Sequence, residues 1–344
     1  MKSKTLLNIV YAALLLTITS CERRLLEDAF YESALIPVKI DWTNSGIPVT
    51  DVSGSGYVHR VSLRFFPKDG SPVFDRYMES NVIEGEIEVP VGEYSVVVFN
   101  ESVHDIYWED AIYFTDVNSY SDFAANIVAD KASNHPFYKP LIGENLIVEP
   151  FRLASWSIDD FNVTSDMVLQ TNWQRNGTNG TRAPQTDDMI NALTKIVMRQ
   201  LTHTVTVHAW VENLSSAQLL QGAARGFAKK VYMASALTEQ IQATHIFVLN
   251  SRKWDDASQI NGTVEKSFLS FGILPMPSDY WLNMDVLFTT GVIYDQPLLY
   301  DVSDGVIRQV QMSININISL NIKLPYVEGG IYVGDWEDEN ITLR

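Results

Sequence analysis

The sequence predicts an all-β protein built from β-sandwich domains, and three observations support this prediction. Apolar and polar residues alternate with a period of two in several segments, as they do in half-buried antiparallel strands. Turn residues separate these segments, as in Pro67-Lys68-Asp69-Gly70, where the proline presets φ and the glycine tolerates a positive φ. The 344 residues are 46% hydrophobic and 11% aromatic, which is typical of a globular chain long enough for two domains.

The N-terminus has the pattern of a secretory signal. Two lysines precede an apolar run from Leu6 to Ile18, which is too short to span a bilayer. Small residues follow, and directly after them comes Cys21, the only cysteine in the chain. The segment therefore resembles the lipobox of bacterial lipoproteins, in which the signal is cut before a cysteine whose thiol carries lipid. We predict a signal peptide over residues 1–20 and lipidation at Cys21. The alternative is an ordinary signal peptide with a chance cysteine.

Residues 21–35 carry mixed charge without a clear period, and we expect them to form a short lipidated tether. A first β-sandwich domain is predicted over residues 36–150, ending near Pro150. Its strands are expected where alternation is clearest, at Val38–Trp42, Val61–Phe65, Val82–Val89 and Tyr94–Val98. Residues 101–145 are expected to be a long connection with one short strand near Ala111–Thr115.

A second β-sandwich domain is predicted over residues 151–326. Its strands are expected around Val205–Val211, Ile246–Val248, Phe268–Ile273, Trp281–Phe288 and Met312–Leu324. The last of these is the strongest signal, because every second residue is apolar. Residues 172–188 are expected to be a loop, and Ser216–Arg225 is the one stretch with a helical pattern.

Residues 327–344 are predicted to be a C-terminal tail. Ile331 and Val333 alternate with Tyr332 and Gly334, before an acidic end. The tail is therefore a candidate strand for pairing with a partner. A frayed terminus is an alternative of equal weight.

The charge balance argues against nucleic acid as a partner. The formal charge is -17, and removal of the signal with its two lysines moves it to -19. Such a surface repels the phosphate backbone.

No residue pattern in the sequence indicates a catalytic site, a metal site or a cofactor site. Among the six histidines, His203 and His208 are five residues apart, which places them on opposite faces of a strand and not on a shared metal. Three acid pairs could in principle serve a glycosidase, but adjacent acids are more often turn residues: Asp159-Asp160, Asp187-Asp188 and Asp255-Asp256. We therefore predict a non-enzymatic protein. Eight tryptophans leave a carbohydrate platform open as a lesser possibility.

Several segments together resemble a known family in their order and spacing. They are IPVKIDW (36–42), VSLRFFPKDG (61–70), EVPVGEYSVVVFNE (88–101), QGAARGFAKKVYMA (221–234) and the terminal IKLP (322–325). The most specific is the P-x-G-x-Y motif formed by Pro90, Gly92 and Tyr94. With the lipobox, these segments resemble the fimbrillin-associated, fimbrial-anchor-like lipoproteins of Bacteroidales, in an uncharacterised branch.

The resemblance implies two transthyretin-like β-sandwich domains in tandem and a role in anchoring or assembling fimbriae (pili) at the outer membrane. Fimbrial subunits would then be the partners, joined by strand addition. The membrane would be reached through the lipid on Cys21, with the protein exposed on the cell surface. The residues after Cys21 depart from the acidic run frequent in surface-exposed relatives. The alternative function is a glycan-binding surface lipoprotein of a nutrient-uptake system.

Overall fold

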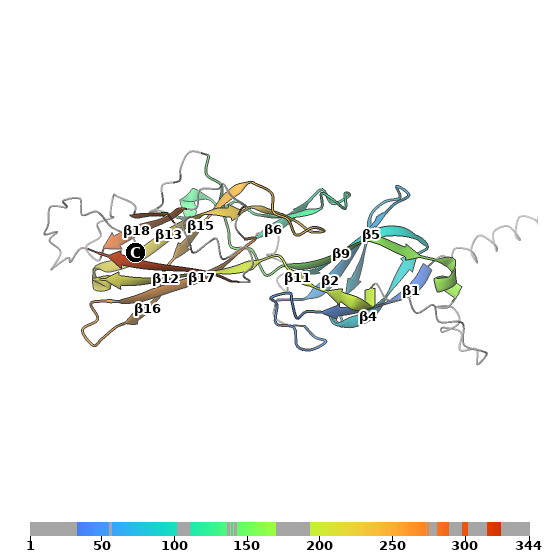
Figure 1. Cartoon of the computed structure of the whole chain (residues 1–344), viewed down its shortest axis with the longest axis horizontal. Helices are drawn as coiled ribbons and strands as arrows, with labels where there is room; N and C mark the ends of the chain where they lie inside the picture. Colours follow the sequence, from blue (N-terminus) through green and yellow to red (C-terminus); the bar gives the residue numbers. More distant parts are fainter. Residues whose placement is uncertain are drawn as a thin grey trace, which may run out of the picture.

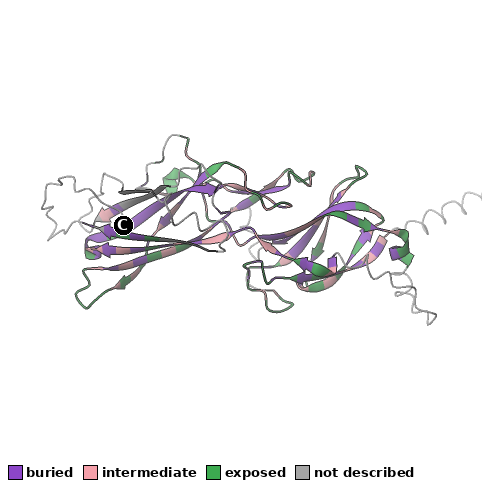
Figure 2. Cartoon of the chain, in the orientation of Figure 1, coloured by how far each residue is buried: buried purple, intermediate pink, exposed green. Residues whose placement is uncertain are grey.

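The structure is a computed structural model that describes residues 33–54, 57–101, 111–135, 138, 140, 143–169, 193–272, 274, 281–288, 298–301 and 315–324. The signal peptide, Cys21, the loop at 172–188 and the tail at 327–344 lie outside these residues. The described chain is nearly all β, as predicted, and forms an elongated molecule with two lobes along its long axis (Figure 1). Buried residues lie between the sheets of each lobe, whereas exposed residues mark the hairpin tips (Figure 2).

The first lobe is a sandwich of a three-stranded sheet, β10-β1-β4, and a five-stranded sheet, β11-β9-β5-β2-β3. Its strands are β1 (Ser33–Asp41), β2 (Arg60–Pro67), β3 (Phe74–Met78), β4 (Glu84–Pro90), β5 (Gly92–Glu101), β9 (Ala154–Val163), β10 (Ile196–Val197) and β11 (Arg199–Gln200). A short helix covers residues 165–169, and the 3₁₀ turn η3 (Leu193–Lys195) precedes β10. The predicted strands around Val38, Val61, Val82 and Tyr94 are therefore confirmed.

Strand β5 is buried on both faces because its side chains alternate between two cores. Val96 and Val98 point into the core of the first lobe, where the two sheets meet. Val97 and Phe99 point the other way, into a separate cluster between the lobes. Such a strand reads as a continuous apolar run, as the sequence from Val96 to Phe99 does.

The P-x-G-x-Y motif has a structural cause. A Cβ on Gly92 would lie 2.8 Å from the hydroxyl oxygen of Tyr94, so only glycine leaves room for the tyrosine ring. The ring folds back over the turn, and its hydroxyl donates a 3.0 Å hydrogen bond to the carbonyl of Pro90. The Tyr94 ring also makes edge-to-face contacts with Phe65 and Phe74. The motif thus fixes the β4–β5 turn against the first-lobe core.

The second lobe is a sandwich of a four-stranded sheet, β16-β17-β12-β20, and a five-stranded sheet, β19-β18-β13-β15-β8. Its strands are β8 (Leu146–Ile147), β12 (His203–Glu212), β13 (Ala217–Ala228), β15 (Gln242–Val248), β16 (Ser251–Trp254), β17 (Gly262–Ser270), β18 (Trp281–Phe288), β19 (Leu298–Asp301) and β20 (Asn315–Lys323). The expected strands around Val205, Ile246, Phe268 and Trp281 are confirmed.

The helix expected over Ser216–Arg225 is wrong. The 3₁₀ turn η4 (Leu214–Ser216) leads directly into β13, which pairs with β15 on one side and β18 on the other. Most of β13 is buried on both faces, so its sequence lacks the alternation that would have identified a strand. A Cβ on Gly222 would lie 2.2 Å from the Phe247 ring, which accounts for the glycine at this position of the central strand.

The strand predicted over Met312–Leu324 is confirmed as β20 from Asn315 to Lys323, and residues 312–314 lie outside the described part. It runs parallel to β12 with nine paired positions, from Thr204–Asn315 to Glu212–Lys323. Leu320 and Ile322 are buried, whereas Ser319 and Asn321 are exposed, as the period of two requires. The side chains of Ile316 and Ile318 lie outside the described part.

A third sheet, β14-β7-β6, joins the lobes. It consists of β6 (Ile112–Thr115), β7 (Ala124–Ile127) and β14 (Lys230–Tyr232), with the 3₁₀ turn η2 (Ala132–Asn134) following β7. The short strand expected near Ala111–Thr115 is confirmed as β6, but it belongs to this separate sheet.

The path of the chain departs from two domains in simple succession. After β5 it enters the third sheet, adds β8 to the second lobe, and returns to the first lobe with β9 to β11. Strands on both sides of Pro150 therefore share the first-lobe sheet, in which β9 pairs with β5. β1 begins at Ser33, three residues before the expected domain start, and Ala34 is already buried. Alternation identifies strands, but it does not say which sheet they join.

Candidate functional site

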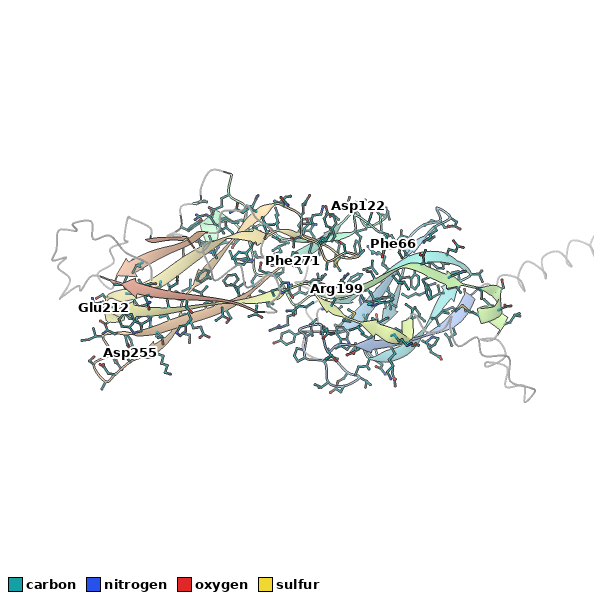
Figure 3. All side chains as sticks on the ribbon, in the orientation of Figure 1. Phe66, Asp122, Arg199, Glu212, Asp255 and Phe271 are labelled. Atoms are coloured by element: carbon teal, nitrogen blue, oxygen red, sulfur yellow. The ribbon has the colours of Figure 1, made fainter. Side chains whose placement is uncertain are left out.

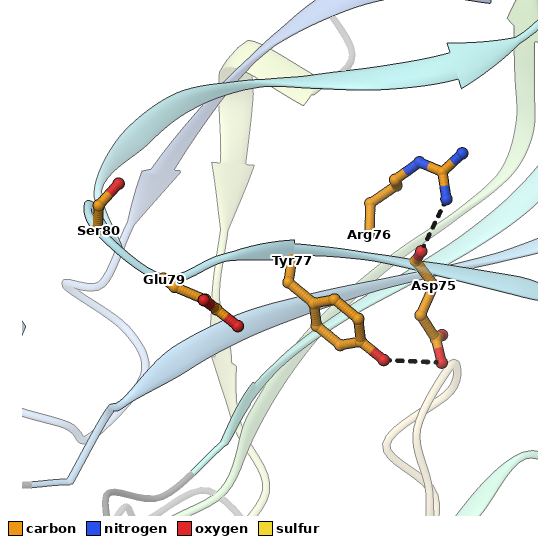
Figure 4. Close-up of a pocket in the computed structure, with 5 residues that line it drawn as sticks. All are labelled: Asp75, Arg76, Tyr77, Glu79 and Ser80. Atoms are coloured by element: carbon orange, nitrogen blue, oxygen red, sulfur yellow. Dashed lines mark hydrogen bonds between the residues drawn. The ribbon is translucent and has the colours of Figure 1, made fainter.

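The described residues offer two kinds of functional feature: free sheet edges, and a buried junction between the lobes. β3 is one such edge, because its only paired neighbour among the described strands is β2. Beside it lies a shallow hollow lined by Asp75, Arg76, Tyr77, Glu79 and Ser80 (Figure 4). Arg64 on β2 holds Asp75 through two 2.8 Å bonds, from Nε to Oδ1 and from Nη2 to Oδ2.

The edge at β3 is closed to a partner strand by Arg76. Its Nη1 donates a 3.0 Å hydrogen bond to the carbonyl of Asp75, as Figure 4 shows, and its Nε donates a 2.6 Å bond to the carbonyl of Glu88 on β4. The guanidinium thus spans the open side of the sandwich between β3 and β4. Charged side chains placed on sheet edges prevent unwanted pairing, so this edge is protected.

The edge at β20 is different. β20 ends the four-stranded sheet, and within the described residues it pairs with β12 alone. An edge strand presents a row of backbone N–H and C=O groups that can pair with another chain. The exposed side chains of β20 include Ser319 and Asn321, which are small and polar. Of the described edges, this one combines a long regular strand with nearness to the C-terminal tail in sequence.

The junction between the lobes is a third apolar core. It joins the outer face of the first-lobe sheet, the third sheet and the near end of the second lobe, and we call it the junction core. Figure 3 labels two of its phenylalanines, Phe66 and Phe271, in the middle of the molecule. Its largest side chains that are completely or almost completely buried are Phe66, Phe99, Ile112, Phe123, Ile127, Ile147, Leu153, Met233 and Phe271.

Polar side chains fix the same junction. Ser155 and Ser157 on β9 donate from Oγ to the carbonyls of Met233 and Ala234, at 2.8 and 2.7 Å. Arg199 on β11 donates from Nη2 to the same Ala234 carbonyl at 2.6 Å. All three donors belong to the first lobe, and both acceptors follow β14. Directional bonds on top of apolar burial therefore define one orientation between the lobes.

A buried ionic cluster ties a connecting segment to the second lobe. Arg225 on β13 donates from Nε to Glu144 at 2.5 Å and from Nη2 to the Tyr138 hydroxyl at 2.6 Å. Tyr138 and Thr244 both donate to Glu144, at 2.7 and 2.8 Å. Burial, together with the bond to Glu144, raises the pKa of Tyr138 above its usual range. Because the Glu144 carboxylate is engaged by three donors, the cluster serves structure and leaves no free acid for chemistry.

The acid pairs considered for hydrolysis are separated or solvated. Asp159 and Asp160 both approach Lys68, and their side chains are 70% and 88% exposed. Asp255 accepts a hydrogen bond from an indole, whereas Asp256 caps the next turn. Asp187-Asp188 lies outside the described residues. These acids occupy turns and surfaces, which is the ordinary role of such pairs.

His203 and His208 lie on opposite faces of β12, as the sequence predicted. His208 is exposed and faces Glu265 at 3.4 Å, whereas His203 lies on the side of the buried Val205. In the described part of the chain, no three His, Cys, Asp or Glu side chains are grouped to hold a metal. The same residues include no helix with the length and apolar character needed to cross a membrane.

Comparison with known proteins gives the family. The profile of a family described as a domain of unknown function, DUF5119, matches residues 20–248. The chain belongs to the DUF5119 family. A curated protein of Bacteroides ovatus, provisionally named fimbrium anchoring subunit Fim4B, is 28% identical over 169 residues. That match spans 48% of the DUF5119 chain and 44% of Fim4B, so it covers less than half of either protein.

The fold is shared with a solved structure. A Bacteroides ovatus protein provisionally described as an adhesin superposes with a TM-score of 0.54 and 17% identity, over 87% of this chain and 95% of that one. The fimbrial anchor protein Mfa2 from Porphyromonas gingivalis gives a TM-score of 0.42 and 11% identity, over 84% and 90%. The match to Fim4B confirms the expected resemblance to Bacteroidales fimbrial-anchor-like proteins. At 17% identity, the Bacteroides ovatus structure supports the fold alone.

Proposed function

We propose that this chain is a non-enzymatic cell-surface lipoprotein that anchors fimbriae or assists their assembly. The observation that supports this most is the relationship to Fim4B, whose name is that of a fimbrium anchoring subunit. Among the described strands β20 pairs with β12 alone, and its other edge is a surface of the right kind, because backbone groups along an edge can pair with a strand of a fimbrial subunit. Fimbrial subunits are the proposed partners, and nucleic acid is not.

The junction core suits a protein that transmits force. An anchor transmits force between a membrane and a filament, so a flexible hinge within it would be a weak point. Here the apolar junction core and three side-chain bonds to Met233 and Ala234 hold the lobes in one orientation. The two lobes would therefore act as one rigid spacer between the tether and β20.

Attachment to the outer membrane is proposed to occur through lipid on Cys21, after removal of residues 1–20 and with residues 21–35 as tether. Acyl chains hold a protein at a membrane by about 0.8 kcal/mol per buried CH₂, so two or more chains anchor stably. Cys21→Ser removes the thiol that carries the lipid and should shift the protein from the detergent phase to the aqueous phase. Unchanged partitioning would contradict lipidation.

Strand addition is tested by removing the C-terminal tail, which is the candidate donor strand. Deletion of residues 327–344 should leave the fold intact and weaken association with a co-expressed fimbrial subunit, measured by co-purification from membranes. The double variant Glu84→Gln/Glu86→Gln is the matched control, because it alters exposed charge on β4, in the other lobe. Full association after the deletion would exclude the tail, and β20 would then have to act as an acceptor.

A further inference from the structure

A second surface, remote from the edge at β20, has the features of a ligand site. It is a shallow hollow on the outer face of the four-stranded sheet, at the edge formed by β16. Figure 1 shows β16 at the end of the molecule opposite β1, and Figure 3 labels Asp255 there. Trp254 and Val264 contribute to its lining, and its polar lining residues come from three strands and the turn after β16: His208, Ser251, Lys253, Asp255, Thr263 and Glu265.

Strand register brings these groups together in two neighbouring rows. Glu265 on β17 is paired with His208 on one side and Ser251 on the other. In the next row, Thr263 is paired with Trp210 and Lys253. Adjacent strands are about 4.8 Å apart and successive outward residues about 7 Å apart, so both rows fit within the footprint of a small ligand.

Trp210 adds an apolar surface to this polar group. It lies on β12, and its Nε1 donates a 2.8 Å hydrogen bond to Oδ2 of Asp255, which follows β16. Because β17 lies between these strands, the indole has to extend across it to make the bond. Trp210 is partly buried and does not itself line the hollow, but the hydrogen bond holds its ring next to Asp255, which does.

We propose that the hollow binds a neutral sugar residue of a glycan. A pyranose has an apolar C–H face, which can stack on the Trp210 indole, and a rim of hydroxyls that both donate and accept. Asp255 and Glu265 can accept from these hydroxyls, and Lys253 can donate to them, through charge-assisted bonds. An apolar surface with a few convergent polar groups is the usual composition of a small-molecule site.

The charges favour a neutral sugar over an acidic one. Two carboxylates and a single lysine surround the hollow, and the whole chain carries a formal charge of -17. An anionic glycan would be repelled by both the local and the overall field. β16 and β20 are opposite edges of the same sheet, so a glycan and a partner strand could be held at the same time.

The test uses the full lipidated chain in a detergent without a sugar headgroup. Binding of hexasaccharides of glucose, mannose and galactose is measured by calorimetry, with a hexasaccharide of galacturonic acid as the acidic probe. We expect saturable binding of at least one neutral probe, and at least a tenfold loss of affinity in both Trp210→Ala and Glu265→Gln. Ser267→Ala, on the same face one row further along β17, should bind as the parent does.

The same variants separate this inference from the fimbrial proposal. Trp210→Ala and Glu265→Gln should co-purify with a fimbrial subunit as well as the parent does. Failure of every neutral probe to bind would overturn the sugar site, as would tighter binding of the acidic probe. Neutral binding that survives both substitutions would also overturn it. In each of those cases the hollow is an ordinary solvated sheet face.

Discussion

Phe123→Ala is the most informative single change, because Phe123 belongs to the junction core and to neither lobe core. Its ring is completely buried, and the centroids of Phe66, Phe99 and Phe114 lie 6.0, 5.7 and 5.4 Å away. The guanidinium of Arg64 lies 4.8 Å from the ring centroid. Truncation of a buried phenylalanine costs about 3–5 kcal/mol, and loss of a cation–π contact adds about 0.5–1 kcal/mol.

We therefore expect Phe123→Ala to lower the free energy of unfolding by about 4 kcal/mol in guanidinium titration. Calorimetry should also change, from one transition in the parent to two in the variant, because the lobes lose the contact that makes them unfold together. Tyr113→Ala is the control, since this side chain lies in the same hairpin but is 42% exposed, and it should cost less than about 1 kcal/mol. A loss below about 1 kcal/mol for Phe123→Ala, or a single unchanged transition, would refute the role of the junction core.

Burial lowers the pKa of His245 to about 3 from a usual 6.5, so the unfolded chain binds the extra proton between these pH values. The free energy of unfolding should then fall by about 1.4 kcal/mol per pH unit as the pH drops from 6.5 towards 3, and urea titration of His245→Gln should show a shallower fall. Gly262→Ala should lower the melting temperature, because its Cβ would lie 2.5 Å from a backbone carbonyl of β16, whereas Gly85→Ala meets only a flexible methionine and should cost little. Ile322→Asp puts an unpaired charge at a buried position of β20 and should lower the free energy of unfolding by about 3 kcal/mol or more. The exposed Asn321→Asp should be almost neutral in the same melting experiment. Equal losses for the two variants would contradict the assignment of Ile322 to the buried face and Asn321 to the exposed face.

Alternation of apolar and polar residues is sufficient to identify a strand that has one solvent-exposed face. Val205 to Val211 and the terminal isoleucine-rich tract were identified on this basis, and the structure shows them as the neighbouring strands β12 and β20. Alternation failed for β13, where Ala223, Ala224 and Phe227 lie in a strand that is covered on both sides. A doubly buried strand with small residues has no period by which to recognise it.

The sequence could not predict which strands share a sheet. The separation of β5 from β9 is more than 50 residues, and the partners of Ser155 and Ser157 lie more than 70 residues ahead in the chain. These contacts depend on the return of the chain to the first lobe, which local pattern does not encode. The eight tryptophans leave a carbohydrate platform open, but the sequence could not place the proposed sugar site, since His208, Lys253 and Glu265 meet only through strand register.

The proposed function depends on one physical claim, that this chain contacts a fimbrial subunit at the outer membrane. The most direct measurement is chemical cross-linking of the tagged chain in native cells that carry fimbriae, followed by mass spectrometry of the linked peptides. We expect links from lysines of the second lobe, such as Lys323 at the end of β20, to a fimbrial subunit, and we expect these links to be lost when residues 327–344 are deleted. Recovery of the chain from outer membranes without any link to a fimbrial subunit would contradict it.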